Sequence, residues 1–213
     1  LPMIDVILCD DHALIRRGIR ETLSEAADMR VVGEAGDYGE LRSLMRGTHC
    51  DVLVLDINLP GRSGLDMLHA LKDEGSPVKV LVVSMYPEDQ YAIRALRGGA
   101  YGYVNKGGDP QVIVQAVRTV AQGRKYVTPE IAQMLVESLT APAPEQPHQR
   151  LSDRELQTLL MIASGKRLSD IASELMLSPK TVSVYRARVL EKLGLANNSE
   201  LTVYAIRNGL VGE

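Results

Sequence analysis

Cysteine, long apolar runs and excess charge are all scarce in this chain of 213 residues. Its two cysteines, Cys9 and Cys50, lie in or beside predicted buried strands without CxxC spacing. We therefore expect reduced core thiols rather than a disulfide or a metal site. No window approaches about eighteen uninterrupted apolar residues, and aspartates interrupt LPMIDVILCDDH before it could form a signal-peptide core. We expect a cytoplasmic protein that does not contact a membrane.

The net charge of −3 is divided unevenly along the chain. Residues 1–140 carry 15 basic and 19 acidic side chains, whereas residues 151–213 carry 8 and 7. This contrast is too small to indicate nucleic-acid binding by itself. A content of 45% hydrophobic and 24% charged residues is ordinary for a globular protein, which argues against disorder across the whole chain.

A proline-rich stretch predicts two domains. Residues 141–149, APAPEQPHQ, contain three prolines and no aliphatic residue larger than alanine, which is typical of a semi-extended linker. Before it, residues 128–139 begin with Thr-Pro and carry apolar residues at helical spacing, so we expect an additional helix there. We place a first domain at 1–125, a connecting helix and linker at 126–150, and a second domain at 151–213.

In the first domain, five short apolar runs alternate with segments of helical period. The expected strands are 3–9, 30–35, 52–56, 78–84 and 101–104; the expected helices are 12–26, 38–47, 64–74, 87–97 and 109–122. Five successive βα units specify an α/β fold with a doubly wound, five-stranded parallel sheet. In such a sheet the ligand lies outside the carboxyl ends of the strands, where the strand order reverses.

Polar residues close four of the five runs, so the fold should bring them to one edge of the sheet. Three crowded carboxylates repel one another unless a hard cation such as Mg²⁺ neutralises them. With a lysine and a hydroxyl nearby, such a site suits phosphoryl transfer onto a carboxylate. We expect Asp56 to be the nucleophile that accepts the phosphoryl group, assisted by Lys106 and Ser84. The expected metal ligands are Asp10, Asp11, Asp56 and the backbone carbonyl of Asn58. Any one of these aspartates alone is more often a helix cap or turn former.

Residues 4–122 resemble the receiver domain of bacterial two-component response regulators. The resemblance rests on the DD pair at 10–11, LVLDINLPGRSGLD, the serine of VVSMY and GGAYGYVNK. It implies Mg²⁺-dependent transfer of phosphate to Asp56 from a sensor histidine kinase or a phosphotransfer domain. It also implies that Tyr103 is a switch residue that turns inward with Ser84, although a tyrosine that only covers the sheet edge is the other interpretation.

After the linker every segment is helical, at 152–163, 168–175, 179–193 and 198–208, which predicts an all-α bundle of four helices. Its sequence LSDREL, LSDIASELMLSPKTV and KLGL resembles the LuxR-type helix-turn-helix domain. Basic residues on the third helix alone would be typical of a solvated surface. The resemblance implies contacts with double-stranded DNA, expected to be an inverted repeat, through Lys180, Thr181, Ser183, Val184, Ala187 and Arg188. The last helix either contributes to a homodimer or only packs within the domain.

These observations predict a DNA-binding transcriptional response regulator of the NarL/FixJ-like family, active as a homodimer and not an enzyme. One alternative is a haloacid-dehalogenase-like phosphatase, but that class needs a second acid two residues after Asp56, where this chain has Asn58. The other is a phosphorylation-independent transcription factor whose receiver serves as a dimerisation module. Activation by release of the DNA-binding domain and activation by receiver dimerisation both remain open.

Overall fold

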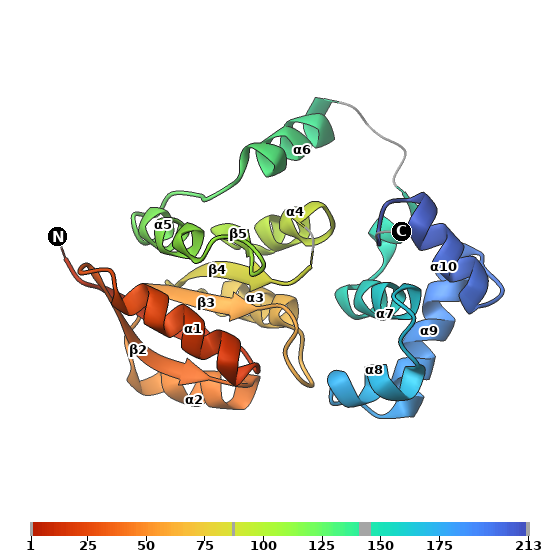
Figure 1. Ribbon diagram of the computed structural model, residues 1–213, viewed down its shortest axis with the longest axis horizontal. Helices are drawn as coiled ribbons and strands as arrows, with labels where there is room; N and C mark the ends of the chain where they lie inside the picture. Colours follow the sequence, from red (N-terminus) through yellow and green to blue (C-terminus); the bar gives the residue numbers. More distant parts are fainter. Residues whose placement is uncertain (1, 87, 141–145, 212–213) are drawn as a thin grey trace. The chain divides into compact units, whose positions relative to one another are not determined.

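The computed structural model describes residues 2–86, 88–140 and 146–211. The chain forms two compact units, residues 1–137 and 138–213 (Figure 1). Part of the proline-rich stretch, residues 141–145, lies outside the described residues.

The first unit contains a five-stranded parallel sheet with the strand order β2-β1-β3-β4-β5. Its strands are β1 (Ile4–Cys9), β2 (Met29–Ala35), β3 (Val52–Asp56), β4 (Lys79–Ser84) and β5 (Gly102–Asn105). The predicted doubly wound sheet is confirmed, with every strand end within one residue of the predicted one. The central strand β3 is buried at all of its positions, as expected for a strand that is covered on both faces.

Helices cover both faces of this sheet (Figure 1). They are α1 (Ala13–Ser24), α2 (Tyr38–Gly47), α3 (Gly64–Asp73), α4 (Glu88–Gly98) and α5 (Pro110–Ala121). Helices α1 and α5 lie on one face, and α2, α3 and α4 lie on the other. No helix in the described part of the chain is both long and apolar enough to cross a membrane.

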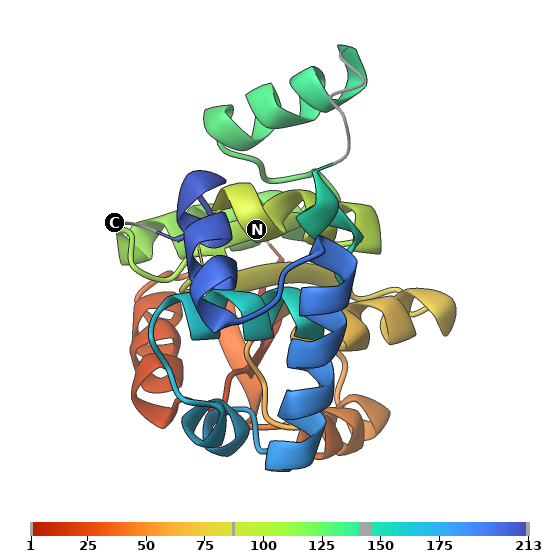
Figure 2. The same cartoon turned by 90° about the vertical axis from the view of Figure 1, so that its right-hand side faces the viewer.

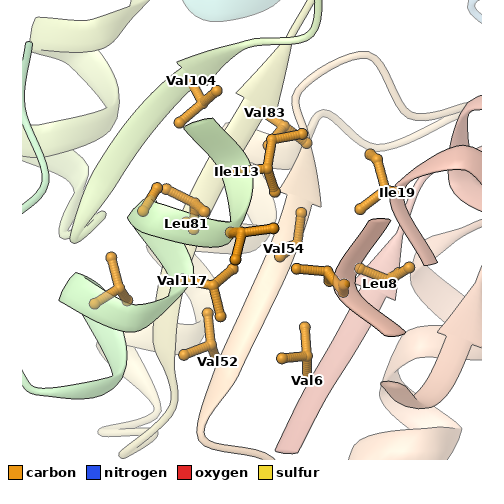
Figure 3. Packing of buried hydrophobic residues seen from close by; sticks show 14 of the residues in the cluster. Val6, Leu8, Ile19, Val52, Val54, Leu81, Val83, Val104, Ile113 and Val117 are labelled. Carbon is orange, nitrogen blue, oxygen red and sulfur yellow. The ribbon is translucent and has the colours of Figure 1, made fainter. Parts of the chain in front are cut away.

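The core beneath α1 and α5 is built from alternate residues of the strands (Figure 3). Val6 and Leu8 of β1 and Val54 of β3 meet Ile19 of α1 and Val117 of α5. Each such buried side chain stabilises the fold by roughly 1.5–3 kcal/mol relative to an exposed one. This layer holds the strands in register, and the register sets where their polar carboxyl ends lie.

Both cysteines are buried, as the sequence predicts. Burial raises the pKa of the Cys9 thiol to about 12 and that of Cys50 to about 11. Neither side chain is therefore a reactive thiolate near neutral pH.

The additional helix before the linker is present as α6 (Pro129–Thr140). Its first turn is attached to the first unit, because the Thr128 hydroxyl donates a hydrogen bond of 2.8 Å to Glu88 of α4. Just before α6, Tyr126 forms an isolated parallel bridge with Gly102 of β5. The chain thus continues along the sheet edge before it reaches α6.

The second unit contains α7 (Asp153–Ala163), α8 (Leu168–Glu174), α9 (Pro179–Leu193) and α10 (Asn198–Arg207). These bounds confirm the predicted four-helix bundle, in which α7 packs against α9 and α10, and α8 packs against α9 (Figure 2). The predicted capping box is formed: the Ser152 hydroxyl accepts from the Glu155 N–H, and the Glu155 carboxylate accepts from the Ser152 N–H.

One short element was not predicted. Residues Pro147–Arg150 form a 3₁₀ turn, η1, where the sequence predicts semi-extended linker. Pro147 occupies the first helical position, where its fixed φ favours a turn. The His148 imidazole also hydrogen-bonds the Tyr204 hydroxyl of α10 at 3.0 Å. This contact joins residues far apart in the sequence, so local composition could not predict it.

Candidate functional site

The strand order reverses between β1 and β3, because the chain passes from β1 to β2 on one side and then returns to β3 on the other. Cys9 pairs with Leu55, so the next residues, Asp10 and Asp56, lie side by side at the carboxyl ends of the two strands. Such a switch point is where doubly wound sheets bind their ligands. The structure therefore places the two predicted aspartates at the position that the topology favours.

Lys106 reaches this position from the end of β5. Its ammonium lies 2.5 Å from one carboxylate oxygen of Asp10 and 2.8 Å from one of Asp56. All three side chains are at most 3% exposed. A buried charge requires a partner of opposite sign, and here one ammonium lies between two carboxylates.

Burial raises the pKa of Asp56 above its usual value. The Lys106 ammonium opposes this shift, and the nearby Asp10 carboxylate adds to it. The backbone N–H of Asn58 also donates to the other oxygen of Asp56 at 3.1 Å. The cations and donors around Asp56 therefore decide whether it is ionised.

The chemistry of the donor set fits a hard divalent cation. Ligand atoms of Asp10, Asp11, His12 and Asp56 all lie within 4.8 Å of one another. Three carboxylates beside one ammonium leave two uncompensated negative charges, which a dication would neutralise. Oxygen ligands are those that Mg²⁺ prefers. Asp10 and Asp56 are buried, whereas Asp11 is exposed at the rim, so a cation can enter from that side.

The two predicted switch residues meet at Tyr86. The fully buried Ser84 hydroxyl accepts from the Tyr86 N–H at 3.1 Å. The Tyr103 hydroxyl donates to the Tyr86 carbonyl at 2.9 Å, and the Asn105 amide donates to the same oxygen at 3.2 Å. Tyr103 is fully buried. Tyr86, which the sequence did not single out, links both switch residues to one loop, and its ring stacks on Tyr91.

Gly64 allows α3 to begin against the acceptor strand. A Cβ at this position would lie 2.0 Å from the backbone oxygen of Asp56 and 2.8 Å from Cα of Ile57. The Gly64 N–H donates to the Ile57 carbonyl at 2.9 Å. Only glycine permits this approach of two backbones.

Two further residues at the acidic pocket were missed. The Nδ1 atom of His12 lies 2.8 Å from a carboxylate oxygen of Asp11 and 3.5 Å from one of Asp10. Arg16 donates to the Asp10 carbonyl and pairs with Glu34 at 2.9 Å. His12 directly follows the acidic pair in the sequence, so its position at the pocket could have been predicted. The contact of Arg16 with Glu34 could not, because it depends on how α1 packs beside β2.

Helix α9 has two distinct faces. Val182 and Val189 are fully buried and hold the helix against the domain. Five of the six residues expected to contact DNA are exposed and follow the i, i+3, i+4, i+7, i+8 pattern of one helical face: Lys180, Ser183, Val184, Ala187 and Arg188. The sixth, Thr181, is half-buried, and its hydroxyl lies 2.8 Å from the Ser178 hydroxyl at the helix N-cap.

The basic residues of α9 differ in their contacts within the domain. Arg186 donates to the Asn198 side chain of α10 at 2.5 Å, and Lys192 pairs with Glu155 of α7 at 2.6 Å. These contacts are internal to the domain. Among the five exposed residues expected to contact DNA, the basic ones are Lys180 and Arg188.

Comparison with known protein families assigns each of the two units to a domain family. A model of the response regulator receiver domain matches residues 6–118, and a model of the bacterial regulatory proteins of the luxR family matches residues 149–205. The chain belongs to the NarL/FixJ-type two-component response regulators. It combines a receiver with a LuxR-type DNA-binding domain, the organisation of a DNA-binding transcription regulator.

Relatives match this response regulator over nearly its whole length. It is 39% identical to the response regulator UvrY of Escherichia coli K12 over 209 residues, which cover 98% of this chain and 96% of UvrY. It is also 39% identical to GacA of Pseudomonas aeruginosa over 210 residues, 98% of each chain. A solved structure of RcsB from Salmonella enterica serovar Typhimurium, bound to a promoter in the presence of the phosphomimetic BeF₃⁻, is 27% identical. It has a TM-score of 0.65 and covers 95% of this chain and 98% of that one.

Proposed function

We propose that Asp56 accepts a phosphoryl group and that its phosphorylation controls DNA binding by the second unit. The observation that carries this proposal is the position of Lys106, whose ammonium lies within 2.8 Å of both Asp56 and Asp10 in a buried pocket. This arrangement supplies a carboxylate nucleophile and a cation for the incoming phosphoryl oxygens.

The donor is the phosphohistidine of a sensor kinase or of a phosphotransfer domain. A carboxylate oxygen of Asp56 attacks the phosphorus, the phosphorus–nitrogen bond breaks, and the imidazole leaves with the bonding electron pair and takes up a proton. The Lys106 ammonium then pairs with the phosphoryl oxygens, and the Ser84 hydroxyl, released from the Tyr86 N–H, donates to one of them.

Asp10, Asp11, Asp56 and the backbone carbonyl of Asn58 would hold Mg²⁺ in this pocket. When bound, Mg²⁺ would neutralise charge on the carboxylates and on the transferred group. We assign no catalytic turnover to the chain, because Asn58 stands where a second acid would be needed.

Phosphorylation adds about 1.5 to 2 negative charges beside Ser84. A shift of the Ser84 hydroxyl would free the Tyr86 N–H, while Tyr103 holds the carbonyl of the same residue. We infer that Ser84 and Tyr103 transmit the modification through this loop to α4 and β5. The equilibrium between the two loop states can shift only by as much free energy as their affinities for the phosphoryl group differ.

For DNA recognition, we propose that α9 enters the major groove of an inverted repeat. Its exposed face presents Lys180 and Arg188 for phosphates and base edges, and Val184, 42% exposed, for thymine methyl groups. Val203 and Ile206 of α10 are also exposed, at 46% and 41%, which supports a second copy of the chain as the partner in a homodimer. A regulator of bacterial DNA works in the cytoplasm.

Intact-mass measurement tests the acceptor. The wild type and Asp56→Asn are incubated with acetyl phosphate, with Mg²⁺ or with EDTA, and Asp73→Asn at the exposed end of α3 serves as the matched control. We expect one phosphoryl group on the wild type and on the control, only with Mg²⁺, and none on Asp56→Asn. Equal labelling of all three proteins would contradict the assignment. Labelling of none, even with phosphorylated kinase as donor, would favour a receiver that acts only as a dimerisation module.

A further inference from the structure

The side chain and the backbone N–H of His12 contact the acidic pocket, whereas its carbonyl accepts a hydrogen bond from the Arg16 N–H of helix α1. His12 is the N-cap residue of α1, yet its side chain makes no capping hydrogen bond. Its backbone N–H instead donates to a carboxylate oxygen of Asp10 at 2.8 Å. Its imidazole lies beside both Asp10 and Asp11. We propose that His12 is a nitrogen ligand of the cation in this pocket and biases the site from Mg²⁺ toward transition-metal dications.

The distances suit a shared ion. A six-coordinate ion with bonds of about 2.1 Å has neighbouring ligand atoms about 3.0 Å apart and opposite ones about 4.2 Å apart. Nδ1 of His12 lies 2.8 Å and 3.5 Å from oxygens of Asp11 and Asp10. The ligand atoms of these three residues and Asp56 all lie within 4.8 Å of one another. These separations are close to those that one octahedral ion requires.

Lys106 does not compete for the same oxygen of Asp10. Its ammonium contacts Oδ2 of Asp10, whereas His12 approaches Oδ1. The pocket thus has an inner side closed by the lysine and an outer side open at His12, whose side chain is 52% exposed. The ordinary explanation of the His12–Asp11 contact is a surface ion pair, which would contribute little stability and have no effect on cation preference.

An imidazole ligand would change which divalent cations the pocket prefers. Mg²⁺ binds oxygen ligands and gains little from an imidazole, whereas Co²⁺, Ni²⁺ and Zn²⁺ bind imidazole nitrogen well. A pocket of carboxylates alone would discriminate less between the two classes of ion. The inference rests on the cation site of the proposed function, and it adds a residue and an ion class to that site.

Calorimetric titration of the full chain with Mg²⁺ and, separately, with Co²⁺ tests the proposal. The variant is His12→Ala, which removes no capping hydrogen bond. The matched control is His49→Ala: His49 is also exposed and lies 3.6 Å from an aspartate, Asp51, but it precedes β3 at the opposite edge of the sheet. We expect His12→Ala to weaken Co²⁺ binding about tenfold or more while Mg²⁺ affinity stays within about twofold, and His49→Ala to change neither.

A spectroscopic readout accompanies the titration. In protein labelled with ¹⁵N-histidine, Zn²⁺ should shift one imidazole nitrogen resonance, which is missing from His12→Ala. Equal losses of Co²⁺ and Mg²⁺ affinity, no loss of either, or no shifted resonance would each overturn the role of His12 while leaving the Mg²⁺ site of the proposed function intact. Failure of the wild type to bind either ion would instead reject the cation site itself, and the inference with it.

Discussion

Replacing Lys106 with methionine leaves Asp10 and Asp56 without the ammonium that lies between them. With an effective dielectric constant of about 20, a pair at 2.8 Å has a Coulomb energy of about 6 kcal/mol, most of which offsets desolvation. Removing one partner of a buried ion pair destabilises a fold by about 3–5 kcal/mol, because the remaining charge stays buried. We therefore expect Lys106→Met to lower the free energy of unfolding of the receiver by about 3–5 kcal/mol in EDTA.

Urea unfolding followed by circular dichroism measures this loss. The matched control is Lys72→Met, an exposed lysine of α3, which should change stability by less than about 0.5 kcal/mol. Because the variant keeps all three carboxylates and loses the Lys106 ammonium, Mg²⁺ should stabilise it more than it stabilises the wild type. A loss in EDTA no larger than that of the control, or an equal response of both proteins to Mg²⁺, would refute the idea that Lys106 compensates the acidic pocket.

Three further perturbations address α3, the second unit and DNA binding. Gly64→Ala should destabilise the receiver by more than about 2 kcal/mol in urea unfolding and reduce phosphorylation by acetyl phosphate, because its Cβ would lie 2.0 Å from the Asp56 carbonyl oxygen. Glu155→Gln should lower stability by about 1 kcal/mol at pH 7 and by progressively less as the pH falls through the pKa of Glu155. Burial acts to raise the pKa of Glu155, but hydrogen bonds from Lys192 and Ser152 outweigh it and hold the pKa below its usual value. The stability that these bonds contribute is thus present above the unfolded-state pKa and lost as the pH falls through the lowered folded-state pKa. Arg188→Ala should weaken DNA binding about tenfold in a shift assay at matched salt.

Each of these predictions has a comparison within the chain. At Gly18 of α1, a new Cβ would have no atom within 4 Å apart from the adjacent backbone of its own helix. Gly18→Ala should therefore leave stability unchanged or raise it slightly, so an equal loss at Gly18 and Gly64 would contradict the crowding argument. If Glu155→Gln lowered stability equally at every pH, the negative charge of Glu155 would not be the cause of the loss. For Arg188, the reference is Arg186→Ala, whose guanidinium contacts Asn198. Equal effects on DNA affinity in two folded variants would contradict the division of α9 into an outer and an inner face.

The order of strands and helices could be predicted from the sequence because it depends on local periodicity. Short apolar runs such as VLVLD are typical of buried strands, and helical spacing with caps such as Ser152 and Glu155 indicates the helices between and after them. The convergence of Asp10, Asp56 and Lys106 also followed, since parallel strands bring their carboxyl ends to one edge. The order of polar residues along the chain was enough to predict the acidic pocket.

Other features required contacts between residues far apart in the sequence. Tyr86 links Ser84 to Tyr103, and Arg186 is tied to α10, only because the tertiary structure brings different segments together. The 3₁₀ turn at Pro147–Arg150 likewise has a hydrogen bond to Tyr204. The periodicity of a segment states which of its faces is apolar, but not which polar side chain on another segment lies opposite. The sequence by itself therefore determined the architecture and the charges of the site, whereas the tertiary structure decided which of those polar groups are paired internally and which remain exposed to a ligand.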